Sequence, residues 1–432
     1  MISGKKSVRL RRVAALALAS AAMGVVAVAC GDDDTASSDT AAATGSTGDI
    51  VQRVDAAQEV CRGSEDPLAA KYSNQQLRDW LRGEQLVTIV ESPWGTGAAT
   101  PRGAAGGPWK IGFSNSFAGN DARQDVIRAM RDQTAAYKEA GLVSGLVETL
   151  SDGDVAKHNN QINQLVQQDV DAIIDLSPGK DATTRAIDAA GEAGVPVITM
   201  DAPAESDYAV NATTANYLQS VESAGWMIEN LGGTGTIVTV QGIKGEPGSE
   251  IWEASAACMF EQFPDIDILA NIYGSWTEPV AKVEMQKVLT TNPGSDIDAV
   301  WVQGPGTTGV IQAFEQTGRP VPKFMTNFGQ KAVLAYWRDN LGDVSMYSAS
   351  QPPYESTVEA YQVMIRVLSG QKPILNAVYN LGPPITDETL DQWVKPEDEW
   401  PGSRGFASIP QEVWMSQDLM NDYFSNGEPV LP

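Results

Sequence analysis

The sequence predicts an α/β protein with two lobes, each a doubly wound parallel sheet, joined by a hinge of three crossovers. A small helical extension precedes the lobes and a C-terminal extension follows them. Two observations lead to this class: short apolar runs typical of strands recur after residue 109, and longer helical patterns separate most of them. Such alternation is typical of parallel sheets with helices on both faces. The 432 residues, 42% of them hydrophobic, suffice for two or three domains.

The expected strands fall into two sets, the first four in one lobe and the next four in the other. The helical patterns between them include residues 124–140 and 155–168. The expected strands cover residues 110–115, 146–150, 172–176, 195–201, 236–241, 267–273, 299–303, 323–327 and 345–349.

The lobes are expected to exchange chain segments. The first lobe is expected to take residues 109–213 and 349–378, and the second lobe residues 214–348. Residues 50–108 combine helical patterns with a stretch rich in glycine and proline, so we expect a helical extension and a loop. Residues 379–432 form a C-terminal extension that either wraps the hinge or a lobe, or contacts a partner. The crossovers are expected near Thr213, Ser348 and Tyr379.

The first thirty residues have the features of an export signal. A basic segment without an acidic residue precedes an apolar run that ends at Ala29, directly before Cys30. This ending resembles a bacterial lipobox, which implies that Cys30 is lipidated and holds the protein on the outer face of the cytoplasmic membrane. The alternative is ordinary cleavage that leaves a free thiol. Residues 31–49 are acidic and lack aromatic residues, so we expect a disordered tether.

Charge and residue counts exclude several classes of function. The formal net charge of −25 repels phosphate backbones, so we expect no nucleic-acid partner. One histidine and three cysteines exclude a multi-histidine metal site and a zinc cluster, and we expect no metal. A Ser-His-Asp mechanism would depend on His158, which we interpret as a polar helix residue. With Cys30 lipidated, Cys61 and Cys258 form either a disulfide or two separate thiols, because sequence gives no distance.

The residues that follow the strands are the candidate ligand contacts, because doubly wound sheets bind ligands beyond the carboxyl ends of their strands. These segments are rich in Gly, Asn, Asp and Trp and contain almost no pair of nucleophile and base. We therefore expect a cleft that holds a polar small molecule without reacting with it. The candidate residues are Asn115, Asn120, Arg123, Asp152, Asp201, Trp252, Trp276, Gln303, Asn327 and Ser350.

Seven segments, in order, carry a resemblance to a known family: IGFSNSFAGNDAR (111–123), DVDAIIDLSPG (169–179), AGVPVITMDAP (193–203), TIVTVQGIKG (236–245), YGSWTEPVAKVEMQKVL (273–289), IDAVWVQGPGTTGVIQAFEQTG (297–318) and SASQPPYESTVEA (348–360). From Trp109 to about Tyr379 the chain resembles a type I periplasmic binding protein of the ribose- and galactofuranose-binding branch, which serves ABC importers. The resemblance implies that Arg123 and Asp201 take sugar hydroxyls and that Trp276 stacks on the apolar face of the ring.

The second lobe departs from the family pattern. Trp252 replaces a usual pocket arginine, and Phe328, or Asn327 if the register slips by one, replaces a sugar-binding aspartate. Ser350, or Gln351 beside it, occupies the place of a pocket glutamine. These replacements imply a ligand with more apolar surface, such as a deoxy sugar, an aryl glycoside or a non-sugar ring.

The function implied is that of a monomeric, lipid-anchored solute-binding protein, without a cofactor, that delivers a sugar or sugar derivative to an ABC permease and its ATPase. One alternative is a ligand sensor of the same fold for a membrane receptor, and another is a binder of an aromatic solute. A secreted hydrolase would need a positioned pair of acid and base, and only Asp152 and Asp201 are candidate cleft carboxylates. We therefore expect no catalytic residues and no enzyme.

Overall fold

The computed structural model describes residues 47–83 and 87–426, all within one compact unit, Gly45–Pro432. The expected signal peptide, with Cys30, lies outside the described residues, as does most of the expected tether. Helix α1 (Thr47–Cys61) begins inside the range expected to be tether. Its Ile50, Val54 and Ala57 are buried along one face, and this apolar face explains why the helix docks there.

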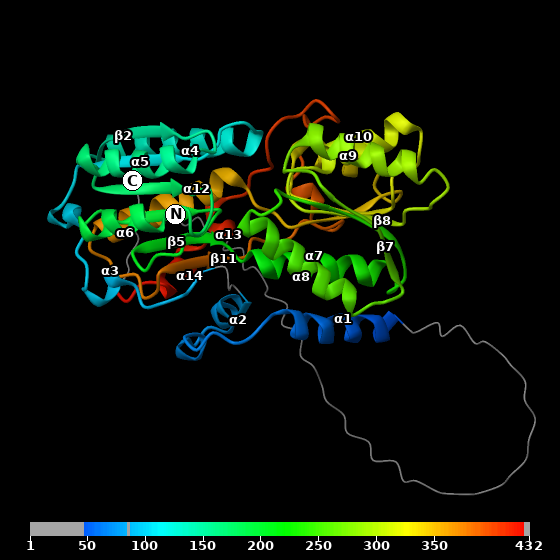
Figure 1. Cartoon of the computed structure of the whole chain (residues 1–432), viewed down its shortest axis with the longest axis horizontal. Helices are drawn as coiled ribbons and strands as arrows, with labels where there is room; N and C mark the ends of the chain where they lie inside the picture. Colours follow the sequence, from blue (N-terminus) through cyan, green and yellow to red (C-terminus); the bar gives the residue numbers. More distant parts are fainter. Residues whose placement is uncertain (1–46, 84–86, 427–432) are drawn as a thin grey trace, which may run out of the picture. The chain divides into compact units, whose positions relative to one another are not determined.

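The first sheet has six parallel strands in the order β11-β5-β4-β3-β1-β2 (Figure 1). Every residue of β3, β4 and β5 is buried, as expected for strands covered by helices on both faces. The strands are β1 (Trp109–Asn115), β2 (Val143–Leu150), β3 (Ala172–Leu176), β4 (Val197–Met200), β5 (Ala209–Thr214) and β11 (Ala377–Asn380). The helices of this lobe are α4 (Asp121–Glu139), α5 (Val155–Gln167), α6 (Thr184–Glu192) and α12 (Pro353–Leu368).

The second sheet repeats this plan with five parallel strands in the order β10-β9-β8-β6-β7. Its strands are β6 (Gly235–Gln241), β7 (Ile266–Tyr273), β8 (Ala299–Val302), β9 (Phe324–Asn327) and β10 (Ser345–Ser348). Its helices are α7 (Asn216–Asn230), α8 (Pro247–Glu261), α9 (Glu278–Thr291), α10 (Thr307–Thr317) and α11 (Lys331–Asp339). The two-lobed α/β class is thereby confirmed.

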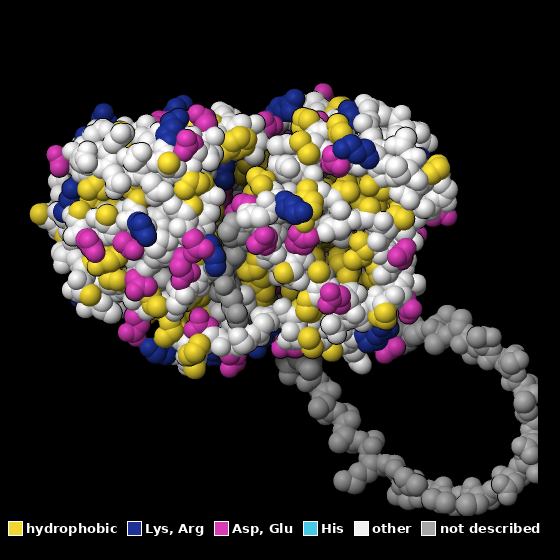
Figure 2. Space-filling model, in the orientation of Figure 1, with side chains coloured by type: hydrophobic (Ala, Val, Ile, Leu, Met, Phe, Trp, Pro, Cys, Tyr) yellow, Lys and Arg dark blue, Asp and Glu magenta, His cyan; other side chains and the backbone are white. Residues whose placement is uncertain are grey.

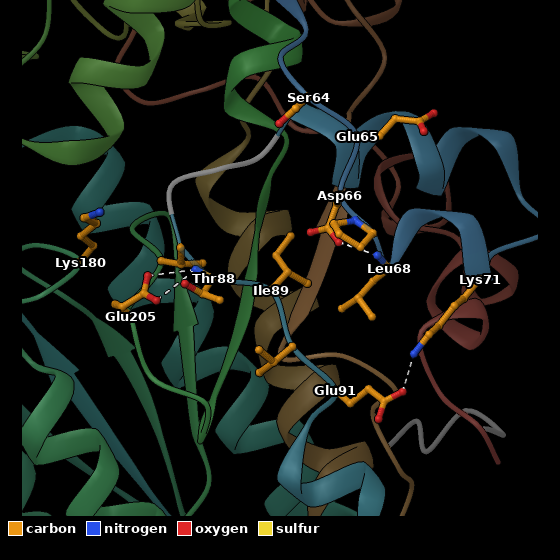
Figure 3. A pocket seen from close by; sticks show the side chains of 13 residues that line it. Ser64, Glu65, Asp66, Leu68, Lys71, Thr88, Ile89, Glu91, Lys180 and Glu205 are labelled. Atoms are coloured by element: carbon orange, nitrogen blue, oxygen red, sulfur yellow. Dashed lines mark hydrogen bonds and ion pairs between the residues drawn. The ribbon is translucent and has the colours of Figure 1, made fainter.

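The N-terminal extension touches both lobes. Helix α1 packs against α7 and α8, and a disulfide joins Cys61 to Cys258. Farther along, the carboxylate of Glu205 in the first lobe accepts from the backbone N–H of Thr88 at 3.0 and 3.2 Å (Figure 3). The other elements of this extension are η1 (Ala69–Lys71), α2 (Gln75–Gly83), α3 (Pro93–Thr96) and η2 (Arg102–Ala105).

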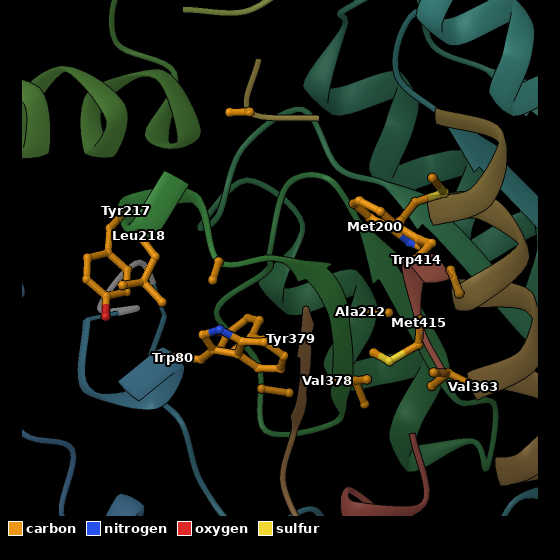
Figure 4. Packing of buried hydrophobic residues seen from close by; sticks show 14 of the residues in the cluster. Trp80, Met200, Ala212, Tyr217, Leu218, Val363, Val378, Tyr379, Trp414 and Met415 are labelled. Carbon is orange, nitrogen blue, oxygen red and sulfur yellow. The ribbon is translucent and has the colours of Figure 1, made fainter. Parts of the chain in front are cut away.

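The C-terminal extension also touches both lobes. Trp393 is buried in a hydrophobic cluster of the second lobe, whereas Trp414 is buried in the cluster that includes the first sheet. Its short helices are η3 (Leu390–Gln392), α13 (Gln411–Trp414) and α14 (Gln417–Asp422). In Figure 4, Trp414 and Met415 lie beside Met200 of β4, and Trp80 of α2 lies against Tyr379 of β11. Both extensions are therefore parts of the core.

The surface carries both signs of charge. On the face shown in Figure 2, lysine and arginine side chains lie among acidic ones over both lobes, and the described residues form no broad basic surface there. Among the described residues, no helix is both long enough and apolar enough to span a bilayer.

Candidate functional site

A cavity of about 370 Å³ lies between the lobes, at the carboxyl ends of both sheets. The segment after every strand from β1 to β10 contributes at least one residue to its wall. This position follows from the topology, because parallel strands of doubly wound sheets direct their carboxyl-terminal loops to one edge. The two lobes present these edges to each other, so the loops of both meet around one space.

The first lobe contributes a pair of opposite charges. Asn120 caps α4, and its Oδ1 accepts from the backbone N–H of Arg123 at 2.9 Å, which fixes the first turn of the helix. The Arg123 guanidinium then donates from Nη1 to Oδ2 of Asp201 at 2.8 Å. Asp201 has a φ of 60°, and its carbonyl accepts from the Thr213 hydroxyl at 3.2 Å. The pair is therefore set by α4 on one side and the turn after β4 on the other.

The second lobe contributes aromatic rings. Trp276, with a φ of 53°, packs its indole over the backbones of Gly242 and Gly304. A Cβ at either glycine would lie 2.3 Å from an indole atom, so only glycine fits at these two positions. Trp252 donates from Nε1 to Oδ1 of Asn216 at 3.2 Å, and its ring centroid lies 5.0 Å from that of Phe328.

Unusual backbone angles gather around the cavity. Among the described residues other than glycine, five have positive φ, and four of them follow the ends of β2, β4 and β7. Non-glycine residues in this region store strain, which persists where the surrounding structure enforces it and is common at functional sites. The four are Asp152, Asp201, Ser275 and Trp276.

A second carboxylate, that of Glu246, lies in the wall of the cavity. It caps α8 and accepts from the backbone N–H of Ser249 at 2.7 Å. Burial raises the pKa of Glu246, while the Ser249 hydrogen bond and the charge of Arg123 act in the opposite direction. The cavity thus combines one guanidinium, two carboxylates and an aromatic wall.

Comparison with known proteins assigns the family. Residues 111–372, more than half of the chain, match the periplasmic binding protein domain. The chain belongs to this family. The resemblance noted in the sequence is thereby confirmed, and the family consists of extracytoplasmic solute-binding proteins rather than enzymes.

Relatives of this periplasmic binding protein are named for sugars and polyols. A xylitol-binding protein of Mycolicibacterium smegmatis is 26% identical over 235 residues, which cover 52% of this chain and 67% of that protein. The ribose import binding protein RbsB of Bacillus subtilis is 23% identical over 220 residues, 50% of this chain and 68% of its own length. A crystal structure of an ABC transporter solute-binding protein from Thermobispora bispora shares the fold, with a TM-score of 0.61 and 24% identity over 75% of this chain and 99% of that one.

Six of the ten candidate residues line the cavity of this periplasmic binding protein. Those six are Asn120, Arg123, Asp201, Trp252, Trp276 and Gln303. Gln303 uses its amide within the protein: Oε1 accepts from the Gly242 N–H and from the Ser249 hydroxyl, and Nε2 donates to the Ser249 carbonyl at 2.9 Å. Gln303 therefore shapes the wall through these hydrogen bonds, which use both ends of its amide within the protein.

The other four candidates lie outside the wall. Asn115 and Asn327 are buried, and each turns its side-chain oxygen onto a backbone N–H two residues on, which shapes the turn after its strand. Ser350 donates to the Pro383 carbonyl at 2.6 Å. Asp152 is exposed and lies 3.4 Å from the Lys157 ammonium.

Their sequence neighbours line the cavity instead. Gly153, Phe328 and Gln351 each follow a candidate residue by one position. Glu246 and Asn216 were missed by the sequence analysis, although both stand directly before or at the start of a helix that follows a strand. Phe406 was missed because it lies far along the C-terminal extension, outside the strand–helix pattern.

His158 is a polar residue on a helix, as interpreted from the sequence. It lies on α5 and is fully buried. Its ring nitrogens lie 2.7 Å from Asp175, 2.9 Å from the Ser114 hydroxyl and 3.1 Å from the Ser151 hydroxyl. These partners satisfy the imidazole inside the first lobe, and none of the four residues lines the cavity. Among the described residues, no group of three His, Cys, Asp or Glu side chains is placed to hold a metal ion.

Proposed function

We propose that this protein is the solute-binding component of an ABC importer and that it binds a small sugar or polyol between its lobes. The observation that carries the proposal is the Arg123–Asp201 pair in the wall of the same 370 Å³ cavity as Trp276. Paired charged groups match neighbouring hydroxyls, and an indole covers the C–H face of a sugar. The relatives named for xylitol and ribose support this class of ligand.

The wall composition favours a ligand with little charge and some apolar surface. Trp252, Trp276 and Phe328 give the second-lobe side three aromatic rings, while the charged groups belong to Arg123 and Asp201 opposite and to Glu246. A pentitol, a pentose or a deoxy sugar presents such a mixture of hydroxyls and C–H groups.

The cellular location and the partners of the protein follow from the same proposal. We infer that the protein is exported, cleaved before Cys30 and held at the outer face of the cytoplasmic membrane by lipid on that residue. It then works as a monomer with a permease and an ATPase. Closure of the lobes around the solute is the change that the permease would recognise.

Isothermal titration of the protein with xylitol, D-ribose and L-arabinose tests the proposal. We expect at least one of them to bind, and Asp201→Asn to weaken that binding by about tenfold or more, since the amide lacks the negative charge that pairs with Arg123 and offers a donor where one carboxylate oxygen accepted. Asn tolerates the same left-handed backbone. Asp169→Asn is the matched control, because Asp169 also has positive φ, at 59°, but lies outside the cavity.

Two results would contradict the proposed function. One is a wild-type protein that binds none of the three compounds. The other is an Asp201→Asn variant that binds them as tightly as the Asp169→Asn control.

A further inference from the structure

The C-terminal extension first runs along the second lobe. Ile385 and Ser348 exchange two backbone hydrogen bonds of 3.0 Å, which continue the edge of the second sheet beyond β10. Trp337 of α11 then donates from its indole to Oδ1 of Asp387 at 2.7 Å. This part of the extension therefore belongs to the second lobe.

Residues 404–408, which we call the strap, then cross from the second lobe to the first. On the second-lobe side, the Lys331 N–H donates to the Gly405 carbonyl at 3.1 Å, and the Ala407 N–H donates to the Gly329 carbonyl at 2.8 Å. On the first-lobe side, the Gly405 N–H donates to Asp121 at 3.1 Å. A backbone segment of five residues is thus bonded to both lobes.

The turn of the strap depends on Gly405. Its φ is +77°, and a Cβ at this position would lie 3.2 Å from Oδ2 of Asp125 on α4. The same Asp125 oxygen accepts from the Phe406 N–H at 3.4 Å. The strap therefore passes close to α4, the helix that carries Arg123.

From the last residue of the strap onward, the extension is anchored on α12 of the first lobe. The Ser408 hydroxyl donates to Glu355, the Trp414 indole donates to Glu359 at 2.9 Å, and the Gln417 amide donates to Gln362 at 2.9 Å. The C-terminal extension is thus bonded to the second lobe before the strap and to the first lobe after it.

Phe406 lines the wall of the cavity and is only 8% exposed. A second space of about 260 Å³, lined also by Arg404 and Gly405 of the strap, shares part of this wall. The residues common to both spaces are Asn120, Ala122, Trp276, Pro305 and Phe406. Phe406 therefore stands between the inner cavity and an outer space beneath the strap.

We propose that Phe406 is a ligand-contacting residue that closes the inner cavity on the strap side and limits the size of the ligand it accepts. The proposal rests on the proposed function, because it takes the 370 Å³ cavity as the ligand site. Phe406 lies outside residues 111–372, which match the family, so the family match itself does not include this residue. A phenyl ring covers apolar surface and excludes water, and its loss joins the two spaces into a larger, wetter one.

Phe406→Ala and Phe424→Ala form a matched pair for the test. Phe424 is also buried in the C-terminal extension, at 5% exposure, but lies outside both spaces. Titration with xylitol and phenyl β-D-xylopyranoside measures the ratio of their dissociation constants. We expect Phe406→Ala to shift this ratio toward the phenyl glycoside by about fivefold or more, whereas Phe424→Ala lowers the melting temperature and leaves the ratio unchanged. An unchanged ratio in Phe406→Ala overturns the proposal.

A second measurement needs no ligand. Ala202 lines the inner cavity, so Ala202→Cys in the full-length protein with Cys30→Ser offers one free thiol, since Cys61 and Cys258 are bonded. N-ethylmaleimide should label it at least about threefold faster with Phe406→Ala than with Phe424→Ala, because the closing ring is gone. Equal rates overturn the proposal.

The two arms separate the two hypotheses. A wild type that binds neither titrant contradicts the sugar or polyol assignment, and the labelling rates then decide the role of Phe406 alone. Phe406→Leu, which keeps an apolar side chain, replaces Phe406→Ala in both arms if the alanine variant does not fold.

Discussion

At the scale of single residues, Glu359 shows how the fold keeps a carboxyl group neutral. It lies on α12, fully buried, where its Oε2 accepts from the Trp414 indole at 2.9 Å and from the Asn380 amide. Burial raises the pKa of Glu359 to about 8, against the opposing effect of these hydrogen bonds. The group therefore carries a proton at neutral pH and links the C-terminal extension to the first lobe without a buried charge.

Glu359→Gln should flatten the pH dependence of stability. Because the pKa of the folded state lies above the unfolded value of 4.5, folding takes up a proton in this range. The contribution of this protonation to the free energy of unfolding is fully present below about pH 4.5 and is lost as the pH rises to about 8. It amounts to at most about 5 kcal/mol. Urea unfolding of wild type and Glu359→Gln between pH 5 and 8 measures the difference.

The exposed Glu412→Gln on α13 is the control for this experiment and should keep the wild-type profile. Parallel curves for wild type and Glu359→Gln would show that Glu359 has no raised pKa in the folded protein.

At the scale of elements, α1 is held to the second lobe by the Cys61–Cys258 disulfide and by close packing. A Cβ at Gly225 of α7 would lie 3.0 Å from Cγ1 of Val54, so the two helices approach each other closely. The disulfide closes a loop of 197 residues, and a loop of that length loses much conformational entropy in the unfolded chain when it is cross-linked.

The double variant Cys61→Ser/Cys258→Ser should therefore lower the free energy of unfolding by about 2–5 kcal/mol. Denaturant titration measures this, and a reducing agent should produce a similar loss in wild type and none in the double variant. Val60→Ser, at an exposed position beside the disulfide, is the control. It should change the free energy of unfolding by less than about 0.5 kcal/mol. A double variant as stable as wild type would contradict the role of the cross-link.

The strands also show how much of the fold could be predicted from the sequence. The expected strands correspond to nine of the observed ones, because short apolar runs that alternate with helical patterns are a strong signal. Strands β5 and β11 were missed, since AVNATT is half polar and AVYN is a four-residue run with no helical pattern directly on either side. Strand β11 spans the boundary expected at 379. It pairs with β5, so its last two residues belong to the first sheet rather than to the extension.

The site was predictable in the segments that connect a strand to the next helix or begin that helix, where Arg123, Asp201 and Trp276 lie. It was not predictable where one register step decides between neighbours, as between Asn327 and Phe328, because both fit the strand end equally well. Phe406 required the path of the whole extension, which depends on tertiary contacts with α4 and α11 rather than on local pattern.

At the scale of the whole described chain, the two extensions couple the lobes. One hydrophobic cluster contains Trp80 from the N-terminal extension, Tyr379 of the first sheet, Trp301 of the second sheet and Trp414 from the C-terminal extension. Separate cores would let the lobes unfold independently, whereas a shared core favours a single cooperative transition.

Differential scanning calorimetry should therefore give one transition for wild type, with calorimetric and van't Hoff enthalpies that agree. Trp80→Ala should broaden or divide it, because Trp80 lies against Tyr379 of the first lobe (Figure 4) and its helix α2 also contacts α7 of the second lobe, where the Tyr217 hydroxyl donates to the Asp79 carbonyl at 2.6 Å. Trp393→Ala removes an equally buried indole from the cluster of the second lobe alone, so it should lower the melting temperature and keep one transition. Two resolved transitions in wild type would show that the extensions do not couple the lobes.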